Sequence, residues 1–591
     1  MSIPVERCIV SRDLTEPRLS PDGRCIVYAM AAGGLAALMI DTLNSSPVRQ
    51  LTAYPAPRPG RGFGGGCWCW SADGSAVIYA AVDGNLWLQP VPTGSVRRLT
   101  DLESKRAAAA PVAVADGSRI VYVVDDSELW SIDCVGGTPE RLDDGSADFV
   151  FDPSAAPDSS SVAWHAWNAP DMPWDRSRIE RITFDRAASH RTQPLGAVQQ
   201  VRFMTDGAEL CLRDDGGWLN LWLDGTPFFD EPFEHGGPTW GMGQRSFVAS
   251  PDCQRIAFTR NENGLGRLCV IDVGSRTVHE VARGVHGQLS WNGGRLAALR
   301  SGARTPTQVV VYDDTTWERD VVAIGPLSGW EDLPLREPEL IEIAAADGCT
   351  LHARLYKADT STDRLLCWLH GGPTDQWQVT FMPRVAYWRA QGWNVLVPDH
   401  RGSTGHGRAY QQALRGRWGE LDISDTIDVL AHAHAHGWGS GERTAIVGSS
   451  AGGFTALGVA ASSPRLLAAV IAAYPVTDLS GSEDGSDRFE LHYTDSLVGA
   501  LPGAASVRRS RSPLSYAAQL AATPILLLHG DCDQVVPIAQ SRAFVERCVA
   551  GGVDIEFVVY DGEGHGFRKP ENQLDEYRRM HDFLVSRVLG G

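Results

Sequence analysis

Short apolar runs recur through the first half of the chain, and a turn rich in proline, aspartate and glycine introduces each of them. The clearest copies are residues 19–28, 70–79, 114–122 and 249–258. Weaker copies lie near Asp152, Phe203 and Trp291. β-Branched and aromatic residues follow each turn, a pattern that is typical of a strand leaving a tight turn. The first half is therefore predicted to consist of short strands.

The spacing of these copies is roughly 40 residues, the length of one β-propeller blade. About seven copies fit between residues 15 and 325. A closed ring of blades lets many short strands coexist without exposed sheet edges. A β-sandwich whose turns are similar by chance is the alternative, and we expect a propeller of about seven blades.

The pattern changes after residues 325–330. Residues 339–345 and 349–356 alternate apolar and polar positions around an Asp-Gly turn, which predicts a hairpin. Apolar strands are then expected at 365–369, 393–398, 444–447, 468–473, 524–528 and 555–560. Helices are expected at 422–436, 450–461, 538–550 and 571–589. Strand and helix alternation of this kind favours a doubly wound, mostly parallel sheet.

One predicted strand runs into a glycine-flanked serine. Ser450 stands between Gly448 and Gly452, as in the G-x-S-x-G motif of the α/β-hydrolase fold. The sharp turn that exposes the hydroxyl leaves no room for side chains at the two flanking positions. Ser449 lacks such flanks and is the weaker candidate. We expect Ser450 to be a nucleophile at the start of a helix, where the helix dipole favours a developing oxyanion.

Partners for this serine follow in the order that the fold uses, serine, aspartate, histidine. Asp531 and Asp533 both lie after the apolar strand at 524–528, and either could be the triad carboxylate. His565 follows the next strand in a glycine-rich loop. A histidine can take the serine proton and return it to the leaving group, while a carboxylate orients the imidazole.

A Gly-Gly-Pro loop is the candidate oxyanion hole. His370, Gly371 and Gly372 follow the predicted strand at 365–369, as in the H-G-G-type loops that supply one amide donor. The backbone amide of Ala451, directly after the nucleophile, would supply the other. A strand-ending turn without chemical function is the alternative reading of this loop.

Composition limits the partners. The net charge is −19, which disfavours nucleic acid and anionic membranes as partners. The first ten residues include Glu6 and Arg7 and lack the apolar core of a signal peptide. Cys67 and Cys69 are the only close pair among the 12 cysteines, and we expect free thiols in a cytoplasmic protein.

Two further patterns carry weaker expectations. His432 and His436 are spaced like a helical metal pair, but no third ligand is evident nearby, and we expect no metal site. Phe489, Tyr493 and Leu497 fall in a helical stretch before the acidic loop. They are candidates for an apolar specificity pocket, and core packing explains them equally well.

Taken together, these motifs resemble the prolyl oligopeptidase family, specifically its acylaminoacyl-peptidase-like branch. The matching segments are 370–374, 399–407, 417–420, 448–453, His529-Gly530 with Asp533 and Pro537, and 564–566. The resemblance covers nearly the whole chain. It implies a peptidase for short peptides, with a propeller that limits access to the active site.

The family's spacing also assigns residues. Its triad aspartate lies three residues after the His-Gly pair and four before the proline, which selects Asp533. Its oxyanion donors correspond to the backbone of Gly372 and Ala451. Prolyl oligopeptidases proper use a tyrosine at the oxyanion, and the His-Gly-Gly-Pro form departs from that. Dipeptidyl peptidases of this clan carry a Glu-Glu pair in the propeller half, and no Glu-Glu dipeptide occurs here.

We therefore expect an N-terminal segment (1–14) packed on the hydrolase domain, a propeller (15–325) and a catalytic α/β-hydrolase domain (326–591). The predicted activity is hydrolysis of short peptides through an acyl-enzyme on Ser450, without cofactor or metal. An esterase or amidase acting on a small metabolite is one alternative, and a propeller binding module with an inactive hydrolase domain is another. Exo- or endopeptidase action and homo-oligomerisation stay open.

Overall fold

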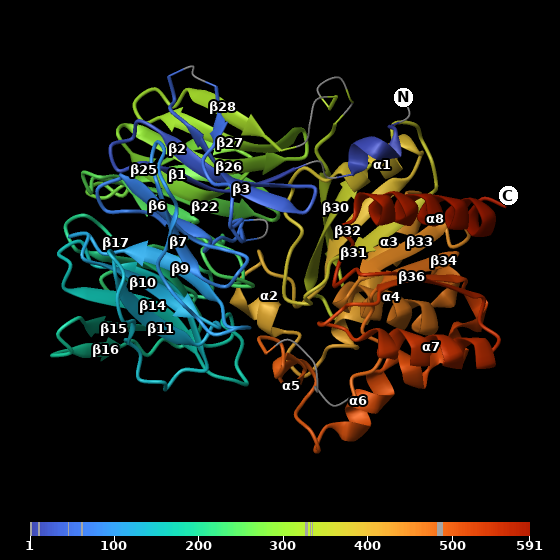
Figure 1. Cartoon of the computed structure of the whole chain (residues 1–591). Helices are drawn as coiled ribbons and strands as arrows, with labels where there is room; N and C mark the ends of the chain where they lie inside the picture. The colour runs from blue at the N-terminus through green and yellow to red at the C-terminus, as the bar shows by residue number, and fades with distance from the viewer. Residues whose placement is uncertain are drawn as a thin grey trace. The chain divides into compact units, whose positions relative to one another are not determined.

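The repeated turns of the first half lie between the first and second strands of four-stranded antiparallel sheets. The computed structural model describes residues 3–9, 12–44, 47–60, 63–325, 329–330, 333, 335–480 and 488–590. Within these residues seven such sheets form, each from four consecutive strands (Figure 1). The predicted seven-bladed β-propeller is confirmed.

The first four blades have the following strand bounds. They are β1–β4 (Asp13–Leu19, Ile26–Ala32, Leu35–Asp41, Arg49–Gln50), β5–β8 (Trp68–Trp70, Ala76–Ala80, Leu86–Pro90, Arg97–Arg98), β9–β12 (Ala108–Ala113, Arg119–Val124, Glu128–Asp133, Glu140–Arg141) and β13–β16 (Phe149–Ala155, Ser161–Trp167, Arg178–Thr183, Ser189–Arg191).

The last three blades continue the same order. They are β17–β20 (Val198–Phe203, Glu209–Arg213, Asn220–Leu223, Thr226–Phe229), β21–β24 (Phe247–Ala249, Arg255–Glu262, Leu265–Asp272, Val278–Arg283) and β25–β28 (Val285–Asn292, Arg295–Gly302, Thr305–Asp313, Arg319–Ile324). The first and last blades close the ring, where the Leu19 amide donates a 3.0 Å hydrogen bond to Ser290 Oγ.

The repeated aspartate has a local structural role. Asp22 accepts a hydrogen bond from the Ser20 hydroxyl at 2.6 Å and one from the Arg24 amide at 3.0 Å. Ser71 and Asp73 make the same side-chain contact at 2.7 Å in the next blade. These bonds satisfy backbone and hydroxyl groups that the tight turn would otherwise leave to water. The sequence repeat is thus a repeat of turn geometry.

The innermost strands share a second repeat. Five of the seven carry a non-glycine residue with positive φ, and the strand pairing shifts at each of these positions. The five residues are Glu16, Ala110, Asp152, Gln200 and Gln288. Such bulges bend the strand and redirect its side chains.

The second half forms one eight-stranded sheet in the order β29-β30-β32-β31-β33-β34-β35-β36. The strands are Glu339–Ala344, Thr350–Tyr356, Leu365–Leu369 (β31), Asn394–Asp399 (β32), Thr444–Ser449, Ala469–Ala473, Ile525–Gly530 and Ile555–Tyr560. The first three in sheet order pair antiparallel, and pairing is parallel from β32 onward. The predicted α/β-hydrolase architecture is confirmed.

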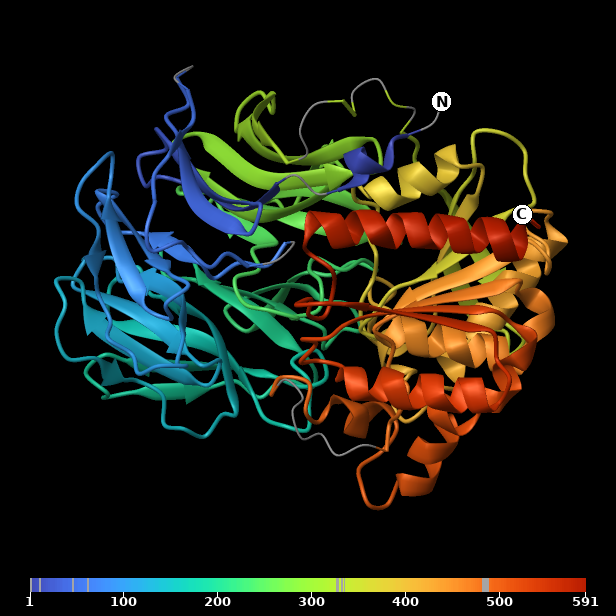
Figure 2. The same cartoon turned by 45° about the vertical axis from the view of Figure 1, so that its right-hand side comes forward.

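Helices cover both faces of this sheet. They are α1 (Pro383–Ala390), α2 (Arg408–Gln412), α3 (Leu421–Ala435), α4 (Ala451–Ser462), α5 (Tyr493–Leu497), α6 (Ala505–Arg511), α7 (Ile538–Ala550) and α8 (Pro570–Val588). Figure 2 shows α8 and α7 on opposite faces of the sheet. The strands between them are almost wholly apolar, because a parallel sheet is buried on both sides.

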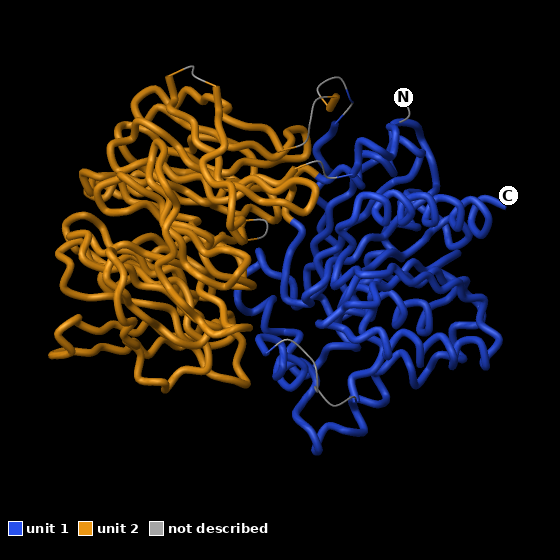
Figure 3. Tube along the Cα trace, in the orientation of Figure 1, with its two compact units in different colours: residues 1–10, 332–377, 382–591 blue, residues 11–331, 378–381 orange. Residues whose placement is uncertain are grey.

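The chain divides into two compact units (Figure 3). Unit 1 contains residues 1–10, 332–377 and 382–591, and unit 2 contains residues 11–331 and 378–381. The short segment 378–381 belongs to the propeller unit, where the Val379 amide donates to Gly264 O at 2.8 Å. The domain junction predicted at 325/326 adjoins residues 326–328, which lie outside the described residues. The boundaries drawn from the sequence remain predictions.

The N-terminal segment packs within unit 1. Its short 3-10 helix η1 (Val5–Cys8) contacts α1 and α8. Cys8 is buried there, with its Sγ 3.7 Å from Pro383 O, and Glu6 lies 3.6 Å from Arg578. The η1 segment is therefore held against α1 and α8.

Candidate active site

Ser450 lies at the turn between a strand and a helix. β33 ends at Ser449, α4 begins at Ala451, and Ser450 between them has φ 55° and ψ −124°. A non-glycine residue with positive φ outside the usual left-handed region is strained by about 1–3 kcal/mol. Ser450 is held in this conformation by an amide hydrogen bond to Ala473 O at 3.0 Å. The result is the nucleophile-elbow geometry of this fold.

Close backbone contacts require the glycines of this turn. A Cβ on Gly448 would lie 2.2 Å from Gly452 O, and one on Gly452 would lie 2.5 Å from His370 O. Both distances are far below a van der Waals contact, so no larger residue fits without moving the backbone. The expectation that flanking side chains would collide therefore has a geometric basis in this chain.

Asp533 and His565 are hydrogen-bonded. His565 Nδ1 lies 2.8 Å from Asp533 Oδ2, and the loops that carry them follow β35 and β36. Asp533 is buried, and its Oδ1 accepts the amides of Val535 and Val536, each at 2.9 Å. Burial raises the pKa of Asp533, but hydrogen bonds from His529 and His565 outweigh it and hold the pKa below its usual range. The carboxylate stays charged and faces the imidazole.

Asp531, the other candidate, has a different environment. It is exposed, and its Oδ1 accepts a 2.6 Å hydrogen bond from the Gly562 amide. This contact joins two loops at the edge of the sheet. The carboxylate that contacts His565 is that of Asp533.

Within the described residues, no hydrogen bond joins Ser450 to His565. The side chain of His565 is 22% exposed, and Ser450 is half-buried, so both are within reach of a substrate. Catalytic hydrogen bonds are often long in ligand-free enzymes and shorten when substrate binds. The Asp533 carboxylate already orients the imidazole of His565.

The Gly-Gly-Pro loop lies beside the serine. A Cβ on Gly371 would be 3.6 Å from Ser450 Cβ, and Gly372 has φ +117°, a conformation that favours glycine. Ala451 is buried at the first turn of α4. Both predicted amide donors therefore belong to segments that border the nucleophile.

His370 anchors this loop. It is fully buried, with Nδ1 2.7 Å from Gly371 O and Nε2 2.7 Å from Ser403 Oγ. A carbonyl can only accept, so Nδ1 carries the proton and Nε2 accepts from the serine hydroxyl. Burial, with neighbouring His400, lowers the pKa of His370 to about 4. The loop is held by a neutral imidazole.

The three residues suggested for a specificity pocket are not on one helical face. Of the three, only Tyr493 and Leu497 lie in α5, which is five residues long. Phe489 lies in a turn before it. Tyr493 and Leu497 are buried, and Phe489 is half-buried. The Tyr493 hydroxyl accepts a 3.0 Å hydrogen bond from the Thr374 amide, just after Gly372 in the loop. This geometry therefore fits a role for Tyr493 in holding the predicted oxyanion loop better than a role in a side-chain specificity pocket.

Tyr474 was not singled out by the sequence. Tyr474 directly follows β34 and has φ 39°. Its ring centroid lies 4.6 Å from that of His565. It also packs edge-on against Phe567 at 5.5 Å and borders a cavity of about 160 Å³. Its position one residue after a buried strand, at the carboxyl edge of the sheet, was the available signal.

The rings of the two histidines, His432 on α3 and His436 directly after it, stack against each other. The rings of His432 and His436 are 4.1 Å apart, and His436 Nδ1 contacts His432 O. Across the part of the chain that the structure describes, no group of three or more His, Cys, Asp and Glu side chains could hold a metal ion. In the same residues no helix has the length and apolar character needed to cross a membrane.

Comparison with known proteins adds independent information. Residues 379–590 match the model of the prolyl oligopeptidase family. The chain is 27% identical over 271 residues to dipeptidyl peptidase family member 6 of Caenorhabditis elegans, covering 45% of this chain and 36% of that protein. It is 28% identical over 228 residues to the acylamino-acid-releasing enzyme of Arabidopsis thaliana, covering 37% of this chain and 30% of that protein. These matches thus span about a third of each relative.

Solved structures extend the likeness to the whole chain. A puromycin hydrolase has a TM-score of 0.88 and 26% identity, with 100% of this chain and 97% of that chain covered. The family model covers the segment that contains Ser450, Asp533 and His565. The resemblance inferred from the motifs is confirmed, and residues 379–590 carry the match to the prolyl oligopeptidase family.

Proposed function

We propose that the protein is a serine peptidase that hydrolyses short peptides, of the acylaminoacyl-peptidase or oligopeptidase type. The observation that carries this proposal is the 2.8 Å contact of His565 Nδ1 with a buried, charged Asp533, on loops that follow β35 and β36 as the strained Ser450 turn follows β33 in the same parallel sheet. Such a constellation is suited to acyl transfer. The names of the relatives, acylamino-acid-releasing enzyme and dipeptidyl peptidase, support peptides as the substrate class.

In this mechanism Ser450 Oγ attacks the carbonyl carbon of the scissile bond while His565 Nε2 takes the hydroxyl proton. Asp533 keeps Nδ1 protonated and stabilises the imidazolium. The backbone amides of Gly372 and Ala451 donate to the tetrahedral oxyanion. His565 then protonates the leaving amine as the scissile bond breaks. It next takes a proton from the water that attacks the acyl-enzyme, and returns this proton to Ser450 Oγ as the ester bond breaks and the acid product is released.

A panel of small chromogenic substrates tests the proposal. It contains N-acetylated amino-acid and peptide anilides, free-amine dipeptide anilides and a short-chain ester. We expect blocked peptides to be cleaved and Ser450→Ala to lose about 10⁴–10⁶ in rate. Ser449→Ala is the matched control and should retain activity within several-fold, because the neighbouring hydroxyl has no proposed chemical role.

The other outcomes separate the alternatives. Turnover of the ester alone would favour an esterase or amidase for a small metabolite and would overturn the peptidase assignment. Failure to react with a fluorophosphonate probe would favour a propeller binding module with an inactive hydrolase domain. Equal activity of Ser450→Ala and the wild type would mean that Ser450 is not the nucleophile.

The place of action is a further part of this proposal. All 12 cysteines are free, including the close pair Cys67 and Cys69, which fits a reducing compartment such as the cytoplasm. The net charge of −19 supports a small peptide rather than nucleic acid or an anionic membrane as the partner.

A further inference from the structure

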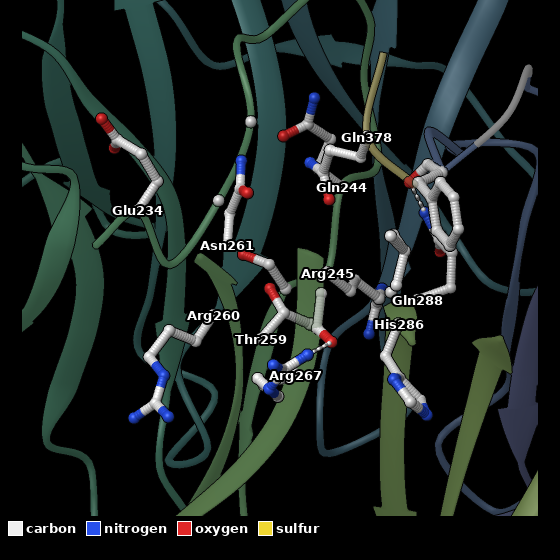
Figure 4. Close-up of a pocket in the computed structure, with 17 residues that line it drawn as sticks. Glu234, Gln244, Arg245, Thr259, Arg260, Asn261, Arg267, His286, Gln288 and Gln378 are labelled. Carbon is white, nitrogen blue, oxygen red and sulfur yellow. Dashed lines mark hydrogen bonds between the residues drawn. The ribbon is translucent and has the colours of Figure 1, made fainter. Parts of the chain in front are cut away.

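A second cavity, of about 100 Å³, lies in the propeller unit, between the blade β21–β24 and the blade β25–β28 (Figure 4). A single buried water needs roughly 10–15 Å³ of such space, so this cavity has room for a small organic acid. Its lining includes three arginines, Arg245, Arg260 and Arg267. The three arginines differ in whether an acidic side chain of the protein already pairs with the guanidinium charge.

Arg260 and Arg267 are both engaged by the protein. Arg260 lies 2.6 Å from Glu262 and 3.4 Å from Glu231. Arg267 lies 3.0 Å from Glu262 and 3.5 Å from Glu280. These two guanidinium groups form the charged wall of the cavity without needing a ligand.

Arg245 is different. Its guanidinium has no hydrogen-bond or ion-pair partner among the described residues, and its Nε is buried. Burial lowers the pKa of Arg245, and the nearby positive charges of Arg18 and Arg202 lower it further. The carboxylates of Asp152 and Glu16 only partly offset this. Because an arginine keeps its proton in proteins, an additional negative charge beside this unpaired guanidinium would stabilise it.

Gln288 adds a second requirement. It is fully buried on a bulge of β25, and its Nε2 donates to Phe63 O at 2.6 Å and to Gly243 O at 2.8 Å. Both partners are carbonyls, so reversing the amide would set oxygen against oxygen, and the orientation is fixed. Gln288 Oε1 is then an acceptor that is buried and has no partner among the described residues. Leaving such a group unpaired is costly, so this position favours an N–H donor.

We propose that this cavity binds a small compound carrying an α-carboxylate next to an N–H group, the carboxylate pairing with Arg245 and the N–H donating to Gln288. Amino acids and N-acyl amino acids share this chemistry, because nitrogen and carboxylate are attached to the same carbon. A guanidinium and a carboxylate form charge-assisted, often bidentate hydrogen bonds. The site belongs to the propeller unit and does not depend on the proposed peptidase activity.

The test is titration calorimetry on the full-length protein whose Ser450 has been blocked with a fluorophosphonate, so that the catalytic serine cannot contribute. If the serine does not react, Ser450→Ala is used instead. The probes are N-acetylglycine and glycine, with acetate lacking the N–H and N-acetylglycinamide lacking the carboxylate. We expect one of the first two to bind with 1:1 stoichiometry, and which of them binds distinguishes an acylated from a free amino acid. The last two should bind at least tenfold more weakly.

Variants of the cavity complete the test. Arg245→Gln should weaken binding about 10–100-fold, the size expected for a charged hydrogen bond. Arg260→Gln, which removes an already paired arginine of the same wall, should change affinity less than threefold. Thermal melts establish that each variant is folded. No binding of either amino-acid probe at 10 mM, equal binding of acetate, or unchanged affinity in folded Arg245→Gln would each overturn the proposal.

Discussion

His565 Nδ1 lies 2.8 Å from Asp533 Oδ2, and the same carboxylate also has His529 Nε2 at 3.4 Å. His529 Nε2 faces Val536 O at 3.0 Å, and its Nδ1 faces Ser541 Oγ at 2.8 Å. Its proton is therefore on Nε2, toward the carbonyl and the carboxylate. Asp533 is fixed from two sides before any substrate arrives.

The two neighbouring aspartates should differ sharply on substitution. Asp533→Asn should lower kcat by about 10⁴, because an amide no longer selects the reactive tautomer of His565. Asp531→Asn should leave kcat within about threefold, since the Asp531 carboxylate is exposed and accepts a loop amide, that of Gly562, on the surface. Steady-state kinetics on an ester and on a peptide anilide measure both. Comparable losses in the two variants would contradict the assignment of Asp533.

The elbow glycine should tolerate no side chain. Gly448→Ala places a Cβ 2.2 Å from Gly452 O, so the turn must open, at a cost on the order of 3 kcal/mol. Gly503→Ala is the control in the same unit, because its Cβ would lie at an ordinary 3.7 Å from Ala500 O. Urea unfolding of the two variants measures the difference. A Gly448→Ala protein as stable as the control would show that the turn is not as close-packed as described.

Tyr493 should act through the oxyanion loop. Tyr493→Phe removes the hydroxyl that accepts the Thr374 amide, so we expect a loss of about 1 kcal/mol in stability. If the loop moves, kcat should fall about tenfold with little change in KM. Tyr516→Phe is the matched control, because the Tyr516 hydroxyl is buried without a hydrogen-bond partner among the described residues. Equal kcat in both variants would exclude a positioning role.

Asp375 should make stability depend on pH. Burial raises its pKa to about 7, and the charge of Asp399 adds to this, while the Gln376 amide opposes it. The folded state thus holds a proton that the unfolded chain releases near pH 4, so stability is lost as pH rises from about 4 to 7. Asp375→Asn has no such proton, and at pH 8 it should be more stable than the wild type by on the order of 2 kcal/mol.

Chemical unfolding at pH 5 and pH 8 measures this effect. The advantage of Asp375→Asn over the wild type should be larger at pH 8. An advantage that is the same at both values would mean that the Asp375 carboxyl titrates normally in the folded protein.

Local patterns were enough to predict much of the fold. The strands expected at 365–369 and 555–560 coincide with β31 and β36, and the helix expected at 538–550 coincides with α7. Apolar runs of this kind are buried on both faces, so their length is set by the sheet itself. The blade count followed from the turns, because each aspartate repeat fixes one hairpin.

Tertiary contacts between distant segments could not be predicted from these local patterns. The position of Tyr474 after a buried strand places it near the carboxyl edge of the sheet but does not indicate that its ring contacts His565, and nothing near Tyr493 indicates its bond to the Thr374 amide. The choice between Asp531 and Asp533 likewise needed either the family's spacing or the fold, because both follow the same strand. Such contacts depend on how separate loops meet at the edge of the sheet.

The packing of η1 on α8 has a consequence for the order of assembly. The residues of η1 are synthesised before the propeller strands, while α8, which they contact, is synthesised after them. Each propeller blade, by contrast, is complete once its four consecutive strands have been synthesised. Unit 1 is therefore complete only when η1 meets α8, after the propeller strands between them have already been produced.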